Sequence, residues 1–416
     1  MMVPLTLINI SNLKREVLMI NGLNKQIALR IINSLGDGVP SIGDVHLFSS
    51  SINPLDSIID SDLKEISSGN YGKVKFLNGS YGEGKSHFLS RVRKKALDND
   101  FLVSMFQISP RGISLDMMER TFSEIMKNLT VKNYSVDCGD SIIEHILNKW
   151  ISTNSDFENI LRKIPIDRDI KAALIEIGKR LDNRDLYYTD LDILDRWFKA
   201  EKHSIGELKK KYKIYNHINP RNVFDILKSF SIFLKKIGYS GLVVLIDEQE
   251  IISTLLTTRR RELTDQNIRI MIDDQGDMDG IYILFATTDE FFNDPLKGVV
   301  SYPALKTRIT KSNTLNLPPI SKDEMYEVAL KLKEICKFAW DAKLRINDEQ
   351  LSKCVQIAIE NNIPSARART YVKSVISLME NIRDGNTTDP VNKFSELYSS
   401  TFNEIATERE HFENEI

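Results

Sequence analysis

Hydrophobic residues dominate four short stretches of the chain, and turn-forming or polar residues bound each stretch. In two of them, 242–246 and 281–286, the hydrophobic residues follow one another without interruption. Such runs are typical of strands buried on both faces of a parallel sheet. A fifth, shorter stretch ends in a proline turn. We therefore predict an α/β fold with a parallel five-stranded sheet. The strands are expected within VKFL (74–77), DFLVSMFQIS (100–109), GLVVLIDEQE (241–250), GIYILFATTDE (280–290) and TLNLPPIS (314–321).

The region between the second and third predicted strands has helical spacing and no convincing strand. Its last segment is the clearest, because Asn219 can cap a helix, Pro220 suits the first turn and Gly238 can end it. The residues from Lys322 onward also repeat apolar positions at helical spacing. The pattern therefore predicts a helical insertion between two strands and a helical domain after the sheet.

The first predicted strand leads into GSYGEGKS (79–86), which fits the phosphate-loop pattern G-x-x-x-x-G-K-[ST]. The glycines let backbone amides turn toward an anion, and the helix expected after the loop adds its positive end. Lys85 would reach the β- and γ-phosphates of ATP, and Ser86 would offer a hydroxyl to Mg²⁺. The residues predicted to bind the nucleotide are Gly79, Ser80, Tyr81, Gly82, Glu83, Gly84, Lys85, Ser86 and His87.

Hydrolysis of ATP needs an acid that holds the metal and a group that orients water. Asp247 and Glu248 follow the apolar run 242–246, at the end of a predicted strand. This is the position of a Walker-B pair. Asp247 would hold Mg²⁺ together with Ser86, and Glu248 would polarise the attacking water.

Three further residues are candidates for catalysis. Thr288, or Thr287 in its place, ends the fourth strand and could hold the attacking water. Arg308 could enter the nucleotide site of a neighbouring subunit in a homo-oligomer, or form a surface salt bridge. Arg369 begins a helix in the C-terminal region and could fold back onto the γ-phosphate of its own chain.

The order of these parts is that of an AAA+-type P-loop ATPase with a C-terminal helical lid. Lys85 and Asp247 lie 162 residues apart, more than such a core needs, and this supports a large insertion between them. The predicted domains are an N-terminal extension that completes the nucleotide pocket (1–70), the first part of the ATPase core (71–138), the helical insertion (139–238), the second part of the core (239–320) and the helical lid (321–416).

The charge and composition of the chain limit the kinds of partner that we expect it to bind. The net charge is −2, so no global basic field draws the chain to nucleic acid, although local basic clusters occur at 209–211, 259–261 and 306–311. Three scattered cysteines suit a reducing compartment, and no apolar run approaches the roughly 20 residues that span a bilayer. We expect a cytoplasmic protein without membrane partners.

Four stretches, 28–50, 78–89, 218–250 and 285–309, resemble the P-loop ATPases of bacterial phage-defence islands, in particular the BrxD-type ATP-binding proteins of BREX systems. The resemblance implies an ATPase related to origin-recognition and Cdc6-type AAA+ proteins. It further implies antiviral defence, in which the chain acts on or near single- or double-stranded DNA together with a helicase and other defence proteins. The alternative function is a slow-turnover, ATP-gated scaffold or loader that recruits a helicase or nuclease to DNA.

Overall fold

The computed structural model describes residues 23–38, 43–51, 53–108, 115–134, 141–183, 188–247, 257–361 and 367–414. The chain forms two compact units. The helical unit consists of Met1–Asp56, Gly79–Arg91 and Asn316–Ile416, and the sheet unit consists of Ser57–Asn78 and Val92–Leu315. The predicted division of the chain into five domains stays a prediction.

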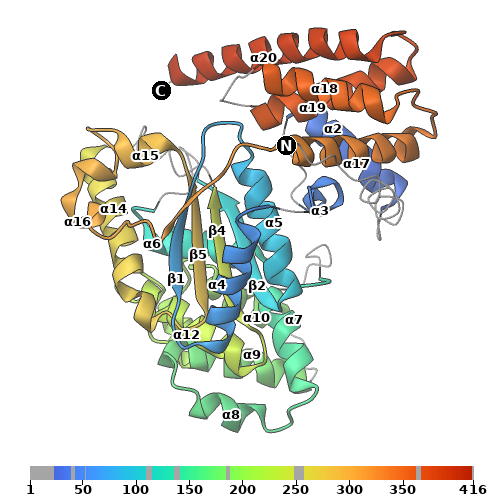
Figure 1. Cartoon of the computed structure of the whole chain (residues 1–416). Coiled ribbons are helices and arrows are strands. Elements are labelled where there is room, and N and C mark those ends of the chain that lie inside the picture. The colour runs from blue at the N-terminus through green and yellow to red at the C-terminus, as the bar shows by residue number, and fades with distance from the viewer. Residues whose placement is uncertain are drawn as a thin grey trace. The chain divides into compact units, whose positions relative to one another are not determined.

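The sheet has six strands in the order β3-β2-β4-β5-β1-β6. Figure 1 labels β1, β5, β4 and β2 within it. Strands β2, β4, β5 and β1 are parallel to one another, as predicted. All seven residues of β4 and all seven of β5 are buried, and this explains why neither strand alternates in polarity. The strands are β1 (Lys73–Asn78), β2 (Phe101–Gln107), β3 (Leu129–Thr130), β4 (Gly241–Asp247), β5 (Ile281–Thr287) and β6 (Thr314–Asn316).

The predicted α/β class is confirmed, but the prediction of five parallel strands was wrong in one respect. Strand β3 adds a sixth strand, and it pairs antiparallel with β2 through Val103 opposite Thr130 and Ser104 opposite Leu129. A strand of two residues is too short to show any periodicity in the sequence.

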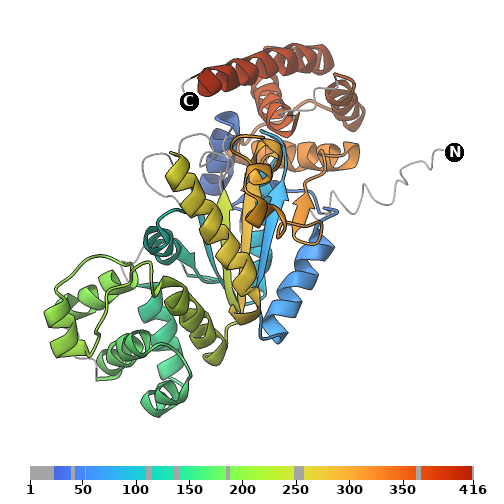
Figure 2. The same cartoon turned by 90° about the vertical axis from the view of Figure 1, so that its left-hand side faces the viewer.

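The insertion between β3 and β4 is helical, as predicted, and lies to one side of the sheet (Figure 2). Its buried side chains are continuous with those of the sheet in one hydrophobic core. The described helices are α7 (Ile142–Ile151), α8 (Phe157–Lys163), α9 (Arg168–Asn183), α10 (Tyr188–Phe198), α11 (Ile205–Glu207) and α12 (Val223–Lys236), with a π-helical turn at Leu208–Tyr212.

The start of α12 differs from its prediction. Asn219 and Pro220 precede the helix in a turn, and Asn222 is the residue before its first turn. Asn222 accepts a hydrogen bond from the Asn219 amide at 2.8 Å, so the two asparagines close this turn on each other. Gly238 ends the helix as predicted, with a left-handed φ of +99°.

The other helices of the sheet unit flank the strands, and α4 lies along the sheet in Figure 1. These elements are α4 (Asp56–Ser68), α6 (Met118–Lys127), α14 (Thr258–Asp273), α15 (Asp289–Asn293) and α16 (Pro303–Lys306). Short 3-10 turns occur at Asp274–Asp277 and Val299–Ser301. Helix α5 (Lys85–Asp98) begins in the helical unit and ends in the sheet unit.

The helical unit has a core of its own, to which both ends of the sequence contribute. The N-terminal helices bury Ala28, Ile31 and Phe48 against the C-terminal helices. Capping boxes at Ser321 and Asn347 define the starts of two of them. The helices are α2 (Lys25–Gly36), α3 (Val45–Phe48), α17 (Lys322–Trp340), α18 (Asp348–Glu360), α19 (Arg367–Arg383) and α20 (Pro390–Asn414). None of the described helices has the length and apolar character required to cross a membrane.

Candidate functional site

The phosphate loop joins the last residue of β1, Asn78, to the first residue of α5, Lys85. Gly82 and Gly84 have left-handed φ values of +73° and +100°, which other residues rarely adopt. The Glu83 carboxylate accepts a hydrogen bond from the Ser80 amide at 2.7 Å and closes the turn. The loop therefore has the backbone twist that turns successive amides toward an anion.

Lys85 lies over this loop rather than in solvent. Its side chain is buried, and Nζ donates to the carbonyl oxygens of Gly79 at 2.9 Å and Ser80 at 3.4 Å. The ammonium group is thus held beside the loop at the N-terminal end of α5, where the helix dipole favours negative charge. Ser86 occupies the first turn of the same helix.

His87 also lies in this first turn and contacts α3. Its Nε2 atom lies 2.8 Å from the Ser49 hydroxyl, and its ring meets Phe48 edge-on with centroids 5.5 Å apart. Burial, together with the positive charge of Arg91, lowers the pKa of His87 to about 4. The imidazole is therefore neutral at pH 7, and the contacts that the structure records for it are with its own chain.

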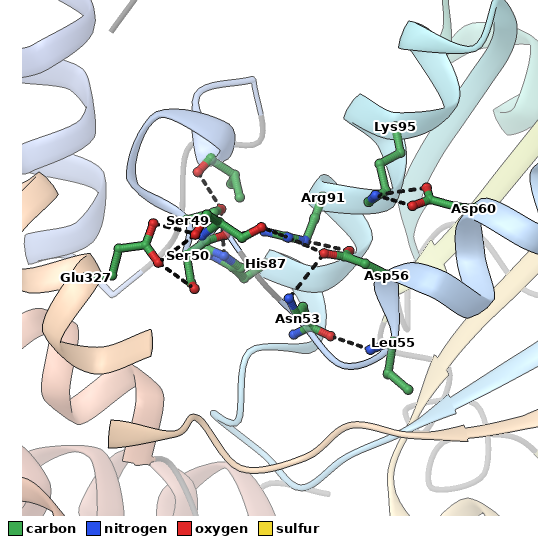
Figure 3. Close-up of polar contacts among 12 residues, drawn as sticks. Ser49, Ser50, Asn53, Leu55, Asp56, Asp60, His87, Arg91, Lys95 and Glu327 are labelled. Atoms are coloured by element: carbon green, nitrogen blue, oxygen red, sulfur yellow. Dashed lines mark hydrogen bonds and ion pairs between the residues drawn. The ribbon is translucent and has the colours of Figure 1, made fainter. Parts of the chain in front are cut away.

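Arg91, one turn further along α5, binds the first residue of α4 and the segment that precedes this helix (Figure 3). Its Nε donates to Asp56 Oδ1 at 2.8 Å, and its Nη2 donates to the other oxygen of the same carboxylate. Its Nη1 donates to the Ser50 carbonyl at 2.5 Å, and Nη2 also reaches the Ser51 carbonyl at 3.2 Å. A planar guanidinium suits this two-pronged contact better than an ammonium would.

The same segment is bound from its other side by α17. Glu327 accepts hydrogen bonds from the Ser50 hydroxyl and the Ser51 amide, both at 2.9 Å. Lys331 donates to the Ser49 carbonyl at 2.5 Å and pairs with Glu327 at 2.9 Å. Residues 49–51, which we call the serine strap, thus connect the helix that follows the phosphate loop to α17 (Figure 3).

Arg369, at the start of α19, lies beside the phosphate loop within the helical unit. Its backbone amide donates to the Gly82 carbonyl at 3.2 Å, and its Nη1 donates to the Tyr81 hydroxyl at 2.6 Å. Its guanidinium carbon lies 5.8 Å from the centre of the Tyr81 ring. A Cβ atom on Gly38 would approach Arg369 Nε to 2.7 Å, so the end of α2 also fits closely around this side chain.

In the sheet unit, three polar residues stand at the carboxyl ends of neighbouring strands. Asn78 of β1 is opposite Thr287 of β5, and Asp247 follows Ile246, which pairs with Phe285 of β5. Because the strands are parallel, these ends share one edge of the sheet. Asp247 is only 1% exposed, which is unusual for a carboxylate and typical of a structural or functional constraint.

The two threonines at the end of β5 differ in their contacts. The Thr287 hydroxyl is fully buried and donates to the Leu77 carbonyl at 3.2 Å. Thr288 is the residue before α15, is 7% exposed and makes no side-chain capping bond to that helix. Glu248 lies outside the described residues. The catalytic roles of Thr288 and Glu248 stay predictions.

Arg308 follows α16 and pairs within its own chain. Its Nε lies 2.5 Å from Asp273 Oδ1 at the end of α14, and its Nη1 donates to the Ala304 carbonyl at 2.7 Å. The salt bridge is one of the two roles that the sequence allowed. Its role in a neighbouring subunit stays a prediction.

Two relations were not foreseen from the sequence. Asn78 immediately precedes the phosphate loop at the strand edge, and Tyr81 contacts Arg369. Asn78 could have been found from its position at the end of a buried run. No sequence signal connects Tyr81 with Arg369. The described part of the chain holds no cluster of three or more metal-ligating His, Cys, Asp or Glu side chains.

Comparison with known proteins gives a family match and seven matching chains of solved structures, two of which are described below. The family described as "BREX system ATP-binding protein BrxC/D" matches residues 23–163 and 184–397. No curated protein matches significantly. The Aeropyrum pernix ORC2 protein in ADPNP and ADP complexes is 14% identical, with a TM-score of 0.47, over 85% of this chain and 69% of that chain. Cdc6p from Pyrobaculum aerophilum is 13% identical, with a TM-score of 0.38, over 82% of this chain and 66% of that chain.

The family match covers well over half of the chain, including the phosphate loop, β4, β5 and Arg369. The matched part thus contains most of the residues on which the predicted chemistry depends. The chain belongs to the BrxC/D family of BREX system ATP-binding proteins.

Proposed function

We propose that the chain is an AAA+-type ATPase that binds ATP with Mg²⁺ and hydrolyses it. The observation that carries this proposal is the state of the phosphate loop. Gly82 and Gly84 have left-handed conformations, Lys85 is held over the loop carbonyls, and Arg369 contacts the loop at Tyr81 and Gly82. Two cations and a helix N-terminus at one glycine-rich loop suit a triphosphate.

The residues present fit a magnesium ion. Mg²⁺ keeps several waters and uses one or two carboxylates together with substrate phosphates, so it needs no closed cage of side chains. Asp247, a buried carboxylate at the end of β4, and the Ser86 hydroxyl in the first turn of α5 would hold it. Bound Mg²⁺ would neutralise charge on the phosphate oxygens.

The remaining candidates would act on water and on phosphate charge. Glu248 would polarise the attacking water, and Thr288 would hold it in line with the γ-phosphate. Arg369 would stabilise the negative charge that spreads over the γ-phosphate oxygens in the transition state. Lys85 would bind the β- and γ-phosphates in both the ground and the transition state.

Family membership supports a role in BREX defence. We propose that ATP turnover in this role serves DNA-processing partners such as a helicase. Hydrolysis would change the contacts of Arg369 with the phosphate loop, because the γ-phosphate would be lost. A nucleotide can shift a conformational equilibrium only through such a difference in contacts between two states.

Titration calorimetry with ATP, with and without Mg²⁺, tests the binding step. Lys85→Ala should weaken ATP binding by about 10- to 100-fold, because a charge-assisted contact is worth about 1.5–3 kcal/mol. Lys94→Ala is the matched control, since Lys94 lies on the same helix and pairs with Asp98 on its exposed side. Absence of magnesium-dependent ATP binding by the unchanged chain would refute the proposal.

Glu248→Gln separates the ATPase from the alternative of an ATP-gated scaffold. The variant keeps the shape of the side chain but removes the carboxylate that would polarise water. For an ATPase, it should bind ATP normally and lose both turnover and phage defence. Retention of full defence without turnover would instead favour the scaffold.

A further inference from the structure

The helical insertion carries an exposed basic segment, residues 208–215, between α11 and α12. Within it, Leu208, Tyr212 and Ile214 are buried in the core of the sheet unit. The residues between these anchors and directly after the last of them are exposed: Lys209, Lys210, Lys211, Lys213 and Tyr215. The π-helical turn and the left-handed φ of +60° at Lys213 give the segment this inward and outward alternation.

Tyr215 is the centre of this surface. It is 40% exposed, although it is a large aromatic residue. The guanidinium carbon of Arg168 lies 4.1 Å from the ring centre, and Lys209 Nζ lies 5.5 Å from it. Two cations therefore lie near one partly exposed ring, and both distances are within the range of cation–π attraction.

A buried frame holds this arrangement in place. Asp169, 3% exposed, contacts Arg168 through one carboxylate oxygen at 3.3 Å. Its other oxygen accepts hydrogen bonds from both the amide and the side-chain nitrogen of Asn216, each at 2.9 Å. The Trp197 ring nitrogen donates to the Asn216 carbonyl at 3.0 Å. The backbone next to Tyr215 is thus fixed before any ligand arrives.

The charge of the segment is not balanced locally. Residues 199–221 contain seven Lys or Arg and two Glu, in a chain whose net charge is −2. Lys211 pairs with Glu207 at 3.4 Å. Within the described ranges, Lys209, Lys210 and Lys213 form no ion pair. An ordinary solvated helix face alternates its charges, whereas this surface concentrates one sign around an aromatic ring.

We propose that Arg168, Lys209, Lys210, Lys213 and Tyr215, which we call the insertion patch, bind single-stranded nucleic acid. The cations would contact successive phosphates, and Tyr215 would stack on a base. Exposed aromatic rings among Lys and Arg are the common means of binding single strands, because every base offers a ring face. The proposal concerns a surface distinct from the phosphate loop and does not rest on ATP binding.

Fluorescence anisotropy of the full chain with a labelled single-stranded oligonucleotide and with its duplex, without nucleotide, tests the proposal. The triple variant Lys209→Glu, Lys210→Glu, Lys213→Glu should lose at least about tenfold in single-strand affinity. It should also lower the slope of log affinity against log salt by roughly 2–3, one for each lost phosphate contact. The control triple Lys25→Glu, Lys64→Glu, Lys343→Glu makes the same charge change at exposed sites elsewhere and should have much less effect.

Tyr215 separates base stacking from charge alone. Tyr215→Ala should weaken single-strand binding about tenfold and leave the weaker duplex binding nearly unchanged. Tyr215→Phe keeps the ring and should therefore bind the single strand as the unchanged chain does. Circular dichroism of each variant establishes that it is folded. Equal losses in the two triple variants, or binding to phosphatidylserine vesicles without binding to the oligonucleotide, would overturn the proposal.

Discussion

The Nη1 atom of Arg369 lies 2.6 Å from the hydroxyl of Tyr81, although 288 residues separate the two in the sequence. Tyr81 belongs to the phosphate loop, and Arg369 belongs to the start of α19. The arginine that we propose to act on the γ-phosphate is thus oriented by a side chain of the loop itself. The tyrosine fills a variable position of the motif, so the contact is a property of this chain rather than of phosphate loops in general.

The first prediction concerns this pair. Tyr81→Phe removes one hydrogen bond and keeps the ring, so ATP affinity should fall about fivefold, the equivalent of about 1 kcal/mol. ADP affinity should be unchanged, because ADP lacks the phosphate that Arg369 would contact. Arg369→Ala should reduce ATP affinity further. Titration calorimetry with both nucleotides measures the difference, and equal losses for ATP and ADP would show that Tyr81 serves the loop alone.

The second prediction tests whether Arg308 acts in a neighbouring subunit. Arg308→Ala and Glu248→Gln should each abolish most turnover, since an arginine supplied in trans is worth about 10³-fold or more. Mixing the two variants should restore part of the activity, because a Glu248→Gln subunit would supply the missing arginine to an intact Glu248 site. Arg269→Ala is the control, since Arg269 also contacts Asp273, at 4.0 Å. If mixing restores no activity, Arg308 does not act in a neighbouring subunit, and its role is the salt bridge with Asp273 in its own chain.

The third prediction concerns pH. The pKa of His87 is about 4 in the fold, below the ordinary value of 6.5 that it would have in the unfolded chain. The unfolded state therefore binds more protons between these values. The contribution of His87 to the stability of the fold is complete above pH 6.5 and is lost as the pH falls toward 4. From pH 7 to pH 5 the loss should be about 2 kcal/mol.

Urea denaturation at the two pH values measures this loss. His87→Gln should remove that part of the pH dependence and leave the rest, and His203→Gln serves as the control. If the unchanged chain and His87→Gln lose the same stability between pH 7 and pH 5, the account of His87 is wrong.

The fourth prediction concerns a buried carboxylate in the sheet unit. Asp62 of α4 is 3% exposed and binds Lys73 and Lys75 of β1, each at 2.6 Å. Asp62→Asn would take the counter-ion from the largely buried Lys75 ammonium, whereas Lys73 would keep its pair with Glu65 at 2.8 Å. The loss should cost about 3 kcal/mol or more. Asp60→Asn, two residues earlier on the same helix, removes a more exposed pair with Lys95 and should cost less than about 1 kcal/mol. Comparable unfolding midpoints for the two variants would contradict this.

The sheet could be predicted because a strand that is buried on both faces needs apolar residues at consecutive positions, as in β4 and β5. Strand β3 could not be predicted, since two residues are too few to show an alternation of apolar and polar positions. The core that α2 shares with the C-terminal helices could not be predicted either. An amphipathic helix shows which of its faces is buried, but not which distant helix covers it.

Some features of the candidate site could likewise be predicted from the sequence, and others could not. The phosphate loop and Asp247 were recognisable because phosphate binding constrains consecutive residues and the position after a strand. The contacts of Tyr81 with Arg369, and of the serine strap with Arg91 and Glu327, join residues far apart in the chain. They depend on how helices pack, and no local pattern encodes that.

The serine strap has a practical consequence for dissecting the protein. Helix α5 holds it through Arg91, and α17 holds it through Glu327 and Lys331. Most of these bonds end on the backbone of residues 49–51, so side-chain substitutions in the strap leave them largely intact. Deleting everything before β1 would instead remove the hydrogen-bond partners of both helices at once. Inactivity of such a shortened chain could result from the loss of these hydrogen bonds between helices. It would therefore say nothing about the chemistry of Lys85 or Asp247.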